Sequence, residues 1–125
     1  MIFDTDVLIW CFRGNKKAAD LIDATKDREI SVVNYMEIVQ VARNKKELRL
    51  VRSFLKELGF AMLPLSENIG SRAGVYMEEY SLKSGLKMED ALIAATAVEQ
   101  QLTLCTANSR HYKIISELEL KTFKP

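Results

Sequence analysis

Short apolar runs alternate with longer amphipathic segments along almost the whole chain. The short runs are apolar or β-branched, which is typical of buried strands, and we expect strands at residues 1–5, 29–34, 60–65, 102–108 and 119–123. Between them, apolar positions recur at helical spacing, so we expect helices at residues 6–13, 16–27, 35–44, 45–58, 66–84, 88–101 and 109–118. Strands that alternate with helices favour an α/β fold with a mainly parallel sheet and helices on both faces.

Polar residues and glycines mark several boundaries of the expected helices. Asn34 is placed to cap the helix at residues 35–44, and Ser66 is placed to cap the long helix that begins there. Gly59 supplies a C-terminal stop for the helix at residues 45–58.

The composition is that of an ordinary folded domain. Hydrophobic residues make up 48% of the 125 residues and charged residues 28%, which suits one core, so we expect a single domain over residues 1–125. The net charge of +1 neither favours nor excludes a polyanionic partner, and the N-terminus has no feature of a signal peptide. With only Cys11 and Cys105 and the single histidine His111, we expect reduced thiols in the cytoplasm and no Cys/His metal cluster.

Two carboxylates interrupt the apolar N-terminal stretch MIFDTDVLIW, where a buried charge needs a compensating partner. Asp4 falls at the carboxyl end of the first expected strand, where ligands bind in parallel α/β sheets, and Asn108 lies just past the fourth strand. Asp90 opens the helix before that strand. This placement indicates one site built from several segments, although Asp4 fits equally well as a helix cap and Asp6 stands in the better capping position.

Four segments together resemble the PIN-domain ribonucleases, and specifically the VapC-type toxins of bacterial and archaeal toxin–antitoxin pairs. They are IFDTDVLI, ISVVNYMEIV, EDALIAATA and TLCTANSRHY, which occur in the family's order and span nearly the whole chain. The resemblance implies a three-layer α/β/α fold with a five-stranded sheet in the order 3-2-1-4-5 and the first strand at its centre. It also implies a divalent-metal-dependent endoribonuclease, the toxin of a type II pair, that hydrolyses phosphodiester bonds in RNA.

Carried over by position, the resemblance assigns catalysis to Asp4, Glu37 and Asp90, with Mg²⁺ or Mn²⁺ held by Asp4 and Asp90. The supporting positions, near these ligands or the substrate, are Asp6, Thr106, Asn108 and His111. Related domains often place a last acid where this chain has His111. We therefore expect one divalent ion to bind firmly and a second only weakly.

From the residues alone, each candidate also has an ordinary structural explanation. Glu37 shares a helix face with Gln40 and Asn44, which is typical of a solvated polar surface. Asp90 lies in a first helical turn, where an acid is favoured in any helix, although this helix is apolar almost all round. A lone histidine such as His111 is more often a structural residue than a ligand.

The resemblance further implies a homodimer and a small antitoxin that binds in a groove beside the site. The candidates for that groove are Trp10, Phe12 and one apolar helix stripe, which comprises Leu48, Val51, Leu55 and Leu58. The same region has a basic outer face suited to RNA phosphates, with the candidates Arg43, Lys45, Lys46 and Arg49. A solvated helix face accounts for these charges equally well.

Two rival functions fit part of the sequence. DTDV also matches the opening of haloacid-dehalogenase-type phosphatases, in which Asp4 would be the nucleophile and Asp6 the acid. Against this alternative, the late acidic pair Glu89 and Asp90 opens a helix instead of following a strand, and the chain lacks a convincing loop lysine. The non-catalytic alternative is a PIN-like module that only binds RNA or a partner, with His111 as the sign of lost activity.

Overall fold

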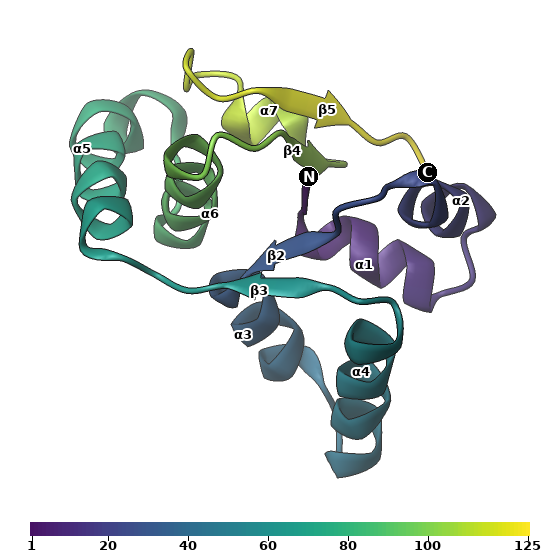
Figure 1. Ribbon diagram of the computed structural model, residues 1–125. Helices are drawn as coiled ribbons and strands as arrows, with labels where there is room; N and C mark the ends of the chain where they lie inside the picture. Colours follow the sequence, from purple (N-terminus) through teal and green to yellow (C-terminus); the bar gives the residue numbers. More distant parts are fainter.

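Five strands form one parallel sheet at the centre of the computed structural model, which describes all of residues 1–125. The strands are β1 (Ile2–Phe3), β2 (Glu29–Ser31), β3 (Ala61–Leu63), β4 (Leu104–Thr106) and β5 (Leu120–Thr122). They lie in the order β3-β2-β1-β4-β5, so the N-terminal strand is central (Figure 1). Every neighbouring pair is parallel. The predicted fold class and strand order are confirmed.

Seven helices cover the two faces of the sheet (Figure 1). They are α1 (Thr5–Phe12), α2 (Lys16–Ala24), α3 (Val32–Val41), α4 (Lys45–Glu57), α5 (Glu67–Ser84), α6 (Met88–Glu99) and α7 (Ser109–Tyr112). Because strand side chains alternate between faces, Ile2 and Leu104 pack in one core with α5 and α6, whereas Phe3 and Cys105 pack in the other with α1 and α2. Leu55 is the only buried residue of α4, which lies at one end of the molecule.

The start of α3 differs from the prediction. β2 ends at Ser31, earlier than expected, and Ser31 rather than Asn34 caps the helix. The Ser31 hydroxyl accepts a hydrogen bond from the N–H of Val33, and the Asn34 side-chain oxygen accepts one from the N–H of Ser31. This capping box fixes the Asn34 side chain and leaves its NH₂ group available on the side of the sheet edge.

Three helices end earlier than predicted, α2 at Ala24, α3 at Val41 and α7 at Tyr112, whereas the caps of α4 and α5 agree with the sequence. Ser66 caps α5 by accepting a hydrogen bond from the N–H of Ile69. The chain leaves α4 and α5 through Gly59 and Gly85, whose φ angles of 67° and 70° lie in the left-handed region that favours glycine. None of the helices combines the length and the apolar character that crossing a lipid bilayer requires.

Candidate active site

The carboxyl edge of the sheet gathers polar side chains from segments far apart in the sequence. Asp4 follows β1, Asn34 lies in the first turn of α3 behind β2, and Thr106 ends β4. Asp90 comes from the first turn of α6, and Tyr112 is the last residue of α7. Parallel strands end at the same edge of a sheet, so one small region receives them all.

Asp4 is the centre of this hydrogen-bond network and is only 7% exposed. Its Oδ1 accepts hydrogen bonds from the N–H of Thr5 at 2.9 Å and from Nδ2 of Asn34 at 3.2 Å. Its Oδ2 accepts one from the Thr106 hydroxyl at 2.8 Å and one from the Tyr112 hydroxyl at 3.1 Å. A carboxylate offers about four lone-pair directions, so Asp4 has a full set of donors.

Asp6 binds the loop after β4 and does not cap α1, so the capping role predicted for it is wrong. Both of its carboxylate oxygens lie 3.2 Å from the N–H of Ala107, and the Thr106 hydroxyl lies 3.4 Å from its Oδ2. The cap of α1 is Asp4, which accepts from the N–H of Thr5. Asp6 therefore ties the N-terminal segment to the loop that carries Thr106.

Glu37 and Asp90 reach the network through the hydroxyls of neighbouring residues. The Thr5 hydroxyl donates to Oε1 of Glu37 at 2.6 Å, and the Tyr112 hydroxyl lies 3.3 Å from Oδ1 of Asp90. His111 is half exposed, with its Nδ1 3.8 Å from Oδ2 of Asp90. The structure thus brings the three predicted catalytic carboxylates to one region.

Burial without a cationic partner raises the proton affinity of this acidic cluster. The pKa of Asp4 is raised to about 7, first by burial and then by the charge of Asp6. Burial also raises the pKa of Asp6, of Glu37 and of Asp90, and His111 acts in the opposite direction on Asp90. No Lys or Arg forms an ion pair with any of the four. The cluster therefore favours the binding of a positive charge.

The donor chemistry of the cluster suits a hard divalent cation, because carboxylate and hydroxyl oxygens are the ligands that Mg²⁺ and Mn²⁺ take. As the side chains stand, however, no group of three acidic, histidine or cysteine residues is close enough to hold a metal. Uncompensated carboxylates repel one another, and each is held instead by a hydroxyl donor. Asp4 and Asp90 share the Tyr112 hydroxyl, as Asp4 and Asp6 share that of Thr106.

Thr5 and Asn34 are site residues that sequence reasoning did not assign, and it considered Tyr112 only as a residue that stacks on a base or belongs to the core, not as a partner of the carboxylates. Asn34 is completely buried and Tyr112 is 1% exposed. The signal for Asn34 was a polar residue inside an apolar, β-branched run, which the sequence explains equally well as a helix cap. Of the supporting positions, Asn108 contributes its backbone N–H to the Thr106 hydroxyl at 3.0 Å, and its side chain does not cap α7.

The predicted RNA-binding residues are exposed and lie at α4, outside this network. Arg43 forms an ion pair with Glu47 at 2.8 Å. None of these basic side chains forms a hydrogen bond or ion pair with the carboxylates of the Asp4 network. The basic residues are Arg43, Lys45, Lys46 and Arg49.

A groove of about 870 Å³ runs between α1, the C-terminal end of α3 and α4. Its apolar lining is formed mainly by Ile9, Phe12, Val41, Leu50, Val51 and Phe54. Phe12 is 38% exposed and Leu50 61%. The predicted groove residues Trp10, Leu48 and Leu58 do not line it, and Leu55 faces the core. Only Phe12 and Val51 of the predicted set line this groove, Leu50 lies in it where Leu48 was expected, and Arg13, Arg43 and Glu47 add charge to its wall.

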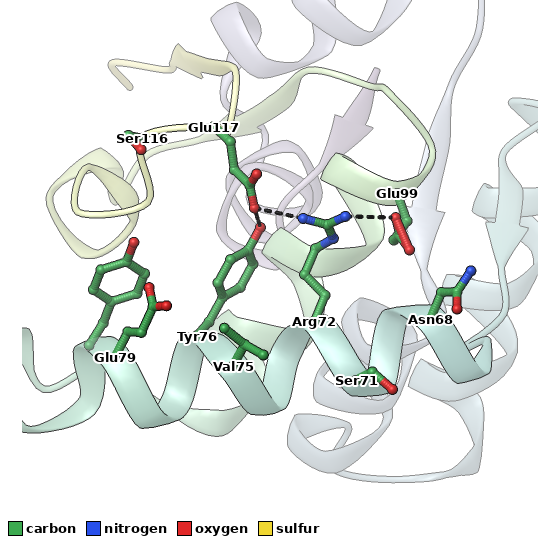
Figure 2. Close-up of a pocket in the computed structure, with 10 residues that line it drawn as sticks. Asn68, Ser71, Arg72, Val75, Tyr76, Glu79, Glu99, Ser116 and Glu117 are labelled. Carbon is green, nitrogen blue, oxygen red and sulfur yellow. Dashed lines mark hydrogen bonds and ion pairs between the residues drawn. The ribbon is translucent and has the colours of Figure 1, made fainter.

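A second acidic cluster lies at the other end of α6, beside a polar hollow of about 520 Å³ (Figure 2). Arg72 of α5 lies between Glu99 and Glu117, with its guanidinium 3.2 Å from the first carboxylate and 2.8 Å from the second. The Tyr76 hydroxyl also donates to Glu117. These bonds tie α5 and α6 to the segment that precedes β5.

The model of the PIN-domain family matches residues 1–116. The chain is also 36% identical to Ribonuclease VapC10 of Mycobacterium tuberculosis, over 95% of this chain and 90% of that relative. This chain is a PIN domain. The PIN domain superposes on a toxin–antitoxin complex from Klebsiella pneumoniae with a TM-score of 0.81 and 30% identity, over 97% of this chain and 95% of that one. DNA-bound VapBC from Salmonella typhimurium shares the fold, with a TM-score of 0.83 and 20% identity over 97% and 96% of the two chains.

Membership of the PIN-domain family gives no support to the phosphatase alternative. A nucleophilic Asp4 needs a free lone pair aimed at phosphorus, whereas Asp4 of this PIN domain is enclosed by four donors. Asp6 is likewise engaged with the N–H of Ala107 and is not free to act as an acid toward a leaving group.

Proposed function

We propose that this PIN domain is a divalent-metal-dependent endoribonuclease and the toxin of a type II toxin–antitoxin pair, acting as a single domain over residues 1–125. The observation that carries the proposal is a cluster of three carboxylates, the buried Asp4 and the partly buried Glu37 and Asp90, that has no Lys or Arg partner. The relative at 36% identity is named a ribonuclease, and the solved structure at 30% identity is a toxin–antitoxin complex.

Mg²⁺ or Mn²⁺ held by Asp4 and Asp90 would lower the pKa of a bound water and stabilise negative charge on the scissile phosphate. Asn34 and Thr106 orient Asp4 through hydrogen bonds to opposite oxygens of its carboxylate. Asp6 fixes the loop that carries Thr106. Partners of this kind set the direction of a ligand and its affinity.

We assign proton transfer to Glu37. It is partly exposed at the rim of the cluster, and the Thr5 hydroxyl holds one of its oxygens at 2.6 Å. Burial moves its pKa upward, toward the range in which a carboxylate exchanges protons efficiently near neutral pH. Its free oxygen then accepts the proton of the attacking water. His111, half exposed beside Asp90, meets the phosphate when it is protonated.

Two exposed features at and beside α4 support the proposed substrate and partner. Arg43, Lys45, Lys46 and Arg49 give a positive surface that attracts RNA phosphates. The apolar groove between α1, α3 and α4 takes a segment of the antitoxin, because apolar side chains such as Phe12 and Leu50 are left uncovered there. We also propose that the toxin is a homodimer, and that it acts in the cytoplasm with Cys11 and Cys105 as free thiols.

An RNA cleavage assay with defined metals tests the activity. We expect fragments with Mg²⁺ or Mn²⁺, no fragments in a chelator, and recovery of cleavage when the metal is added back. Asp4→Asn, purified in parallel, controls for contaminating nucleases. RNA that binds but is never cut with either metal would show that the protein is the non-catalytic module instead.

Copurification with the product of the adjacent small reading frame tests the groove. Leu50→Asp should abolish the complex, because it places a charge in the apolar lining. The matched control is Leu82→Asp on α5, where the leucine is 99% exposed and lies outside the groove. Equal capture by both variants would remove the groove from the proposal.

A further inference from the structure

The Tyr112 hydroxyl lies between two carboxylates that each need a positive charge. Its oxygen is 3.1 Å from Oδ2 of Asp4 and 3.3 Å from Oδ1 of Asp90. A phenol has a single proton, so it donates to only one of them at a time. The other carboxylate lacks that donor, and no Lys or Arg supplies a replacement.

The ring of Tyr112 is not free to leave this position. The residue is 1% exposed and belongs to the core that also contains Ile2, Leu104 and Ile115. A tyrosine held in this way presents its hydroxyl to the site in every molecule, because turning the ring away would open a cavity in the core.

A cation that binds Asp4 has to displace one of its hydrogen-bond donors. All four lone-pair directions are in use, so a cation can bind Asp4 only if one donor gives way. The N–H of Thr5 and the Thr106 hydroxyl make the shorter bonds, at 2.9 and 2.8 Å. Of the two longer ones, only Tyr112 also faces Asp90.

We propose that the Tyr112 hydroxyl takes the place of the cation between Asp4 and Asp90 in the metal-free protein and competes with it for Oδ2 of Asp4. This inference rests on the proposed function, since it assumes that these two carboxylates bind the metal. It assigns Tyr112 a role that opposes the ligands: the hydroxyl stabilises the metal-free site and thereby weakens metal affinity. Tyr112 is therefore a positioning residue that sets how much free metal is needed to load the site.

Calorimetric titration with Mn²⁺ tests the competition in three proteins: the wild type, Tyr112→Phe and Tyr35→Phe. Tyr112→Phe keeps the ring and removes only the hydroxyl, so the metal-free site loses a hydrogen bond that the loaded site does not have. We expect Mn²⁺ to bind this variant roughly ten-fold more tightly, which is the effect of one charge-assisted hydrogen bond. Tyr35→Phe is the matched control, because the Tyr35 hydroxyl makes no hydrogen bond in the structure.

Melting temperatures measured with and without Mn²⁺ provide an independent test. Without metal, Tyr112→Phe should melt below the wild type, and at saturating Mn²⁺ the two melting temperatures should converge. Equal destabilisation with and without metal would show that Tyr112 is only a packing residue. Weaker Mn²⁺ binding by the variant would show that the hydroxyl supports the metal, and either result overturns the competition.

A spectrum of the wild-type protein provides a measurement that needs no variant. Mn²⁺ should shift the near-ultraviolet absorbance of tyrosine, because the Tyr112 hydroxyl loses its carboxylate acceptor. A silent difference spectrum during saturating binding overturns the inference and leaves the proposed function intact. No binding of Mn²⁺ by the wild type refutes the metal dependence itself.

Discussion

The two ends of α6 carry acidic clusters that differ in the source of their positive charge. At the C-terminal end, Glu99 and Glu117 lie on either side of Arg72 (Figure 2), and hydrogen bonds from Tyr76 and Arg72 lower the pKa of Glu117. At the N-terminal end, the acidic cluster around Asp90 has no such cation, and burial raises the pKa of its members.

The two clusters differ in how their negative charge is compensated. Where the chain supplies its own cation, the negative charge is compensated as soon as the protein folds, and the ion pairs hold the elements together. Acids that are buried without a cationic partner are left to bind a proton or a cation from solution. One helix of twelve residues therefore anchors the fold at one end and, in the function proposed above, contributes to the metal site at the other.

The largest expected effect comes from neutralising one acid at each end of α6. Asp90→Asn should reduce Mg²⁺-dependent RNA cleavage by more than about a hundred-fold, because even partners of metal ligands contribute about 10- to 100-fold. Glu99→Gln, the matched control on the same helix, should leave the rate within about two-fold. Initial rates on one RNA substrate measure both. Normal cleavage by Asp90→Asn would refute the site.

The second prediction concerns pH. In the metal-free protein Asp4 has a pKa of about 7 against 3.8 for the free side chain, so the folded state binds its proton more tightly. The contribution of Asp4 to the free energy of unfolding is fully present below about pH 4 and is lost as the pH rises through 7. The loss amounts to up to about 4 kcal/mol. Denaturant unfolding at pH 5 and pH 8 should show it.

Two comparisons sharpen the pH experiment. Saturating Mg²⁺ and the substitution Asp4→Asn should each flatten the pH dependence, since both remove the need for a proton on Asp4. Glu117 contributes with the opposite sign. Because its pKa is lowered, it stabilises the folded protein at pH values above the ordinary glutamate pKa, and this stabilisation is lost in more acidic solution. A metal-free wild type that grows more stable from pH 5 to pH 8 would contradict the assignment for Asp4.

The third prediction removes the internal cation. Arg72→Ala should lower stability by roughly 1 kcal/mol, because Arg72 is one-third exposed and solvent compensates part of the lost ion pairs. The loss should be the same with and without Mg²⁺, and cleavage should not change. Arg52→Ala on exposed α4 is the control for loss of a charge alone. A metal-dependent loss would mean that the two clusters are coupled.

The smallest effect is expected at His111. His111→Asp should bind Mg²⁺ a few-fold more tightly, because it adds a hard oxygen ligand beside Asp90, whereas a neutral imidazole suits Mg²⁺ poorly. His111→Ala should change cleavage far less than Asp90→Asn does. Calorimetry and initial rates measure these effects. Two tight, equivalent Mg²⁺ sites in the wild type would show that His111 does not limit the second ion.

Most of the fold was predictable because its signals are local. Strand residues such as Ile2 and Phe3 are apolar on both sides of the sheet, and the ends of α4 and α5 are marked by Gly59 and Gly85. The start of α3 was not predictable from the pattern, because Ser31 and Asn34 are both good capping residues. Only the position of the backbone decides which of them caps.

The acids of the site could be proposed from the sequence, but the groups that hold them could not. Asp4, Glu37 and Asp90 are conspicuous as carboxylates within family-like segments. Thr5 and Tyr112 are common residue types whose roles depend on contacts far along the chain, such as the bond from Tyr112 to a carboxylate 108 positions away. No periodicity or spacing reports such a contact.

The strands of this sheet are only two or three residues long. Asp4 and Thr106 therefore belong both to the site and to the last hydrogen-bonded positions of the sheet. The amide of Asp4 donates to the carbonyl of Cys105 at 2.8 Å, and the carbonyl of Thr106 accepts from Phe123 at the same distance. We therefore expect the amides of Asp4 and Phe123 to exchange with solvent only when the sheet opens. We expect the carboxyl edge of the sheet to open no more readily than the sheet itself.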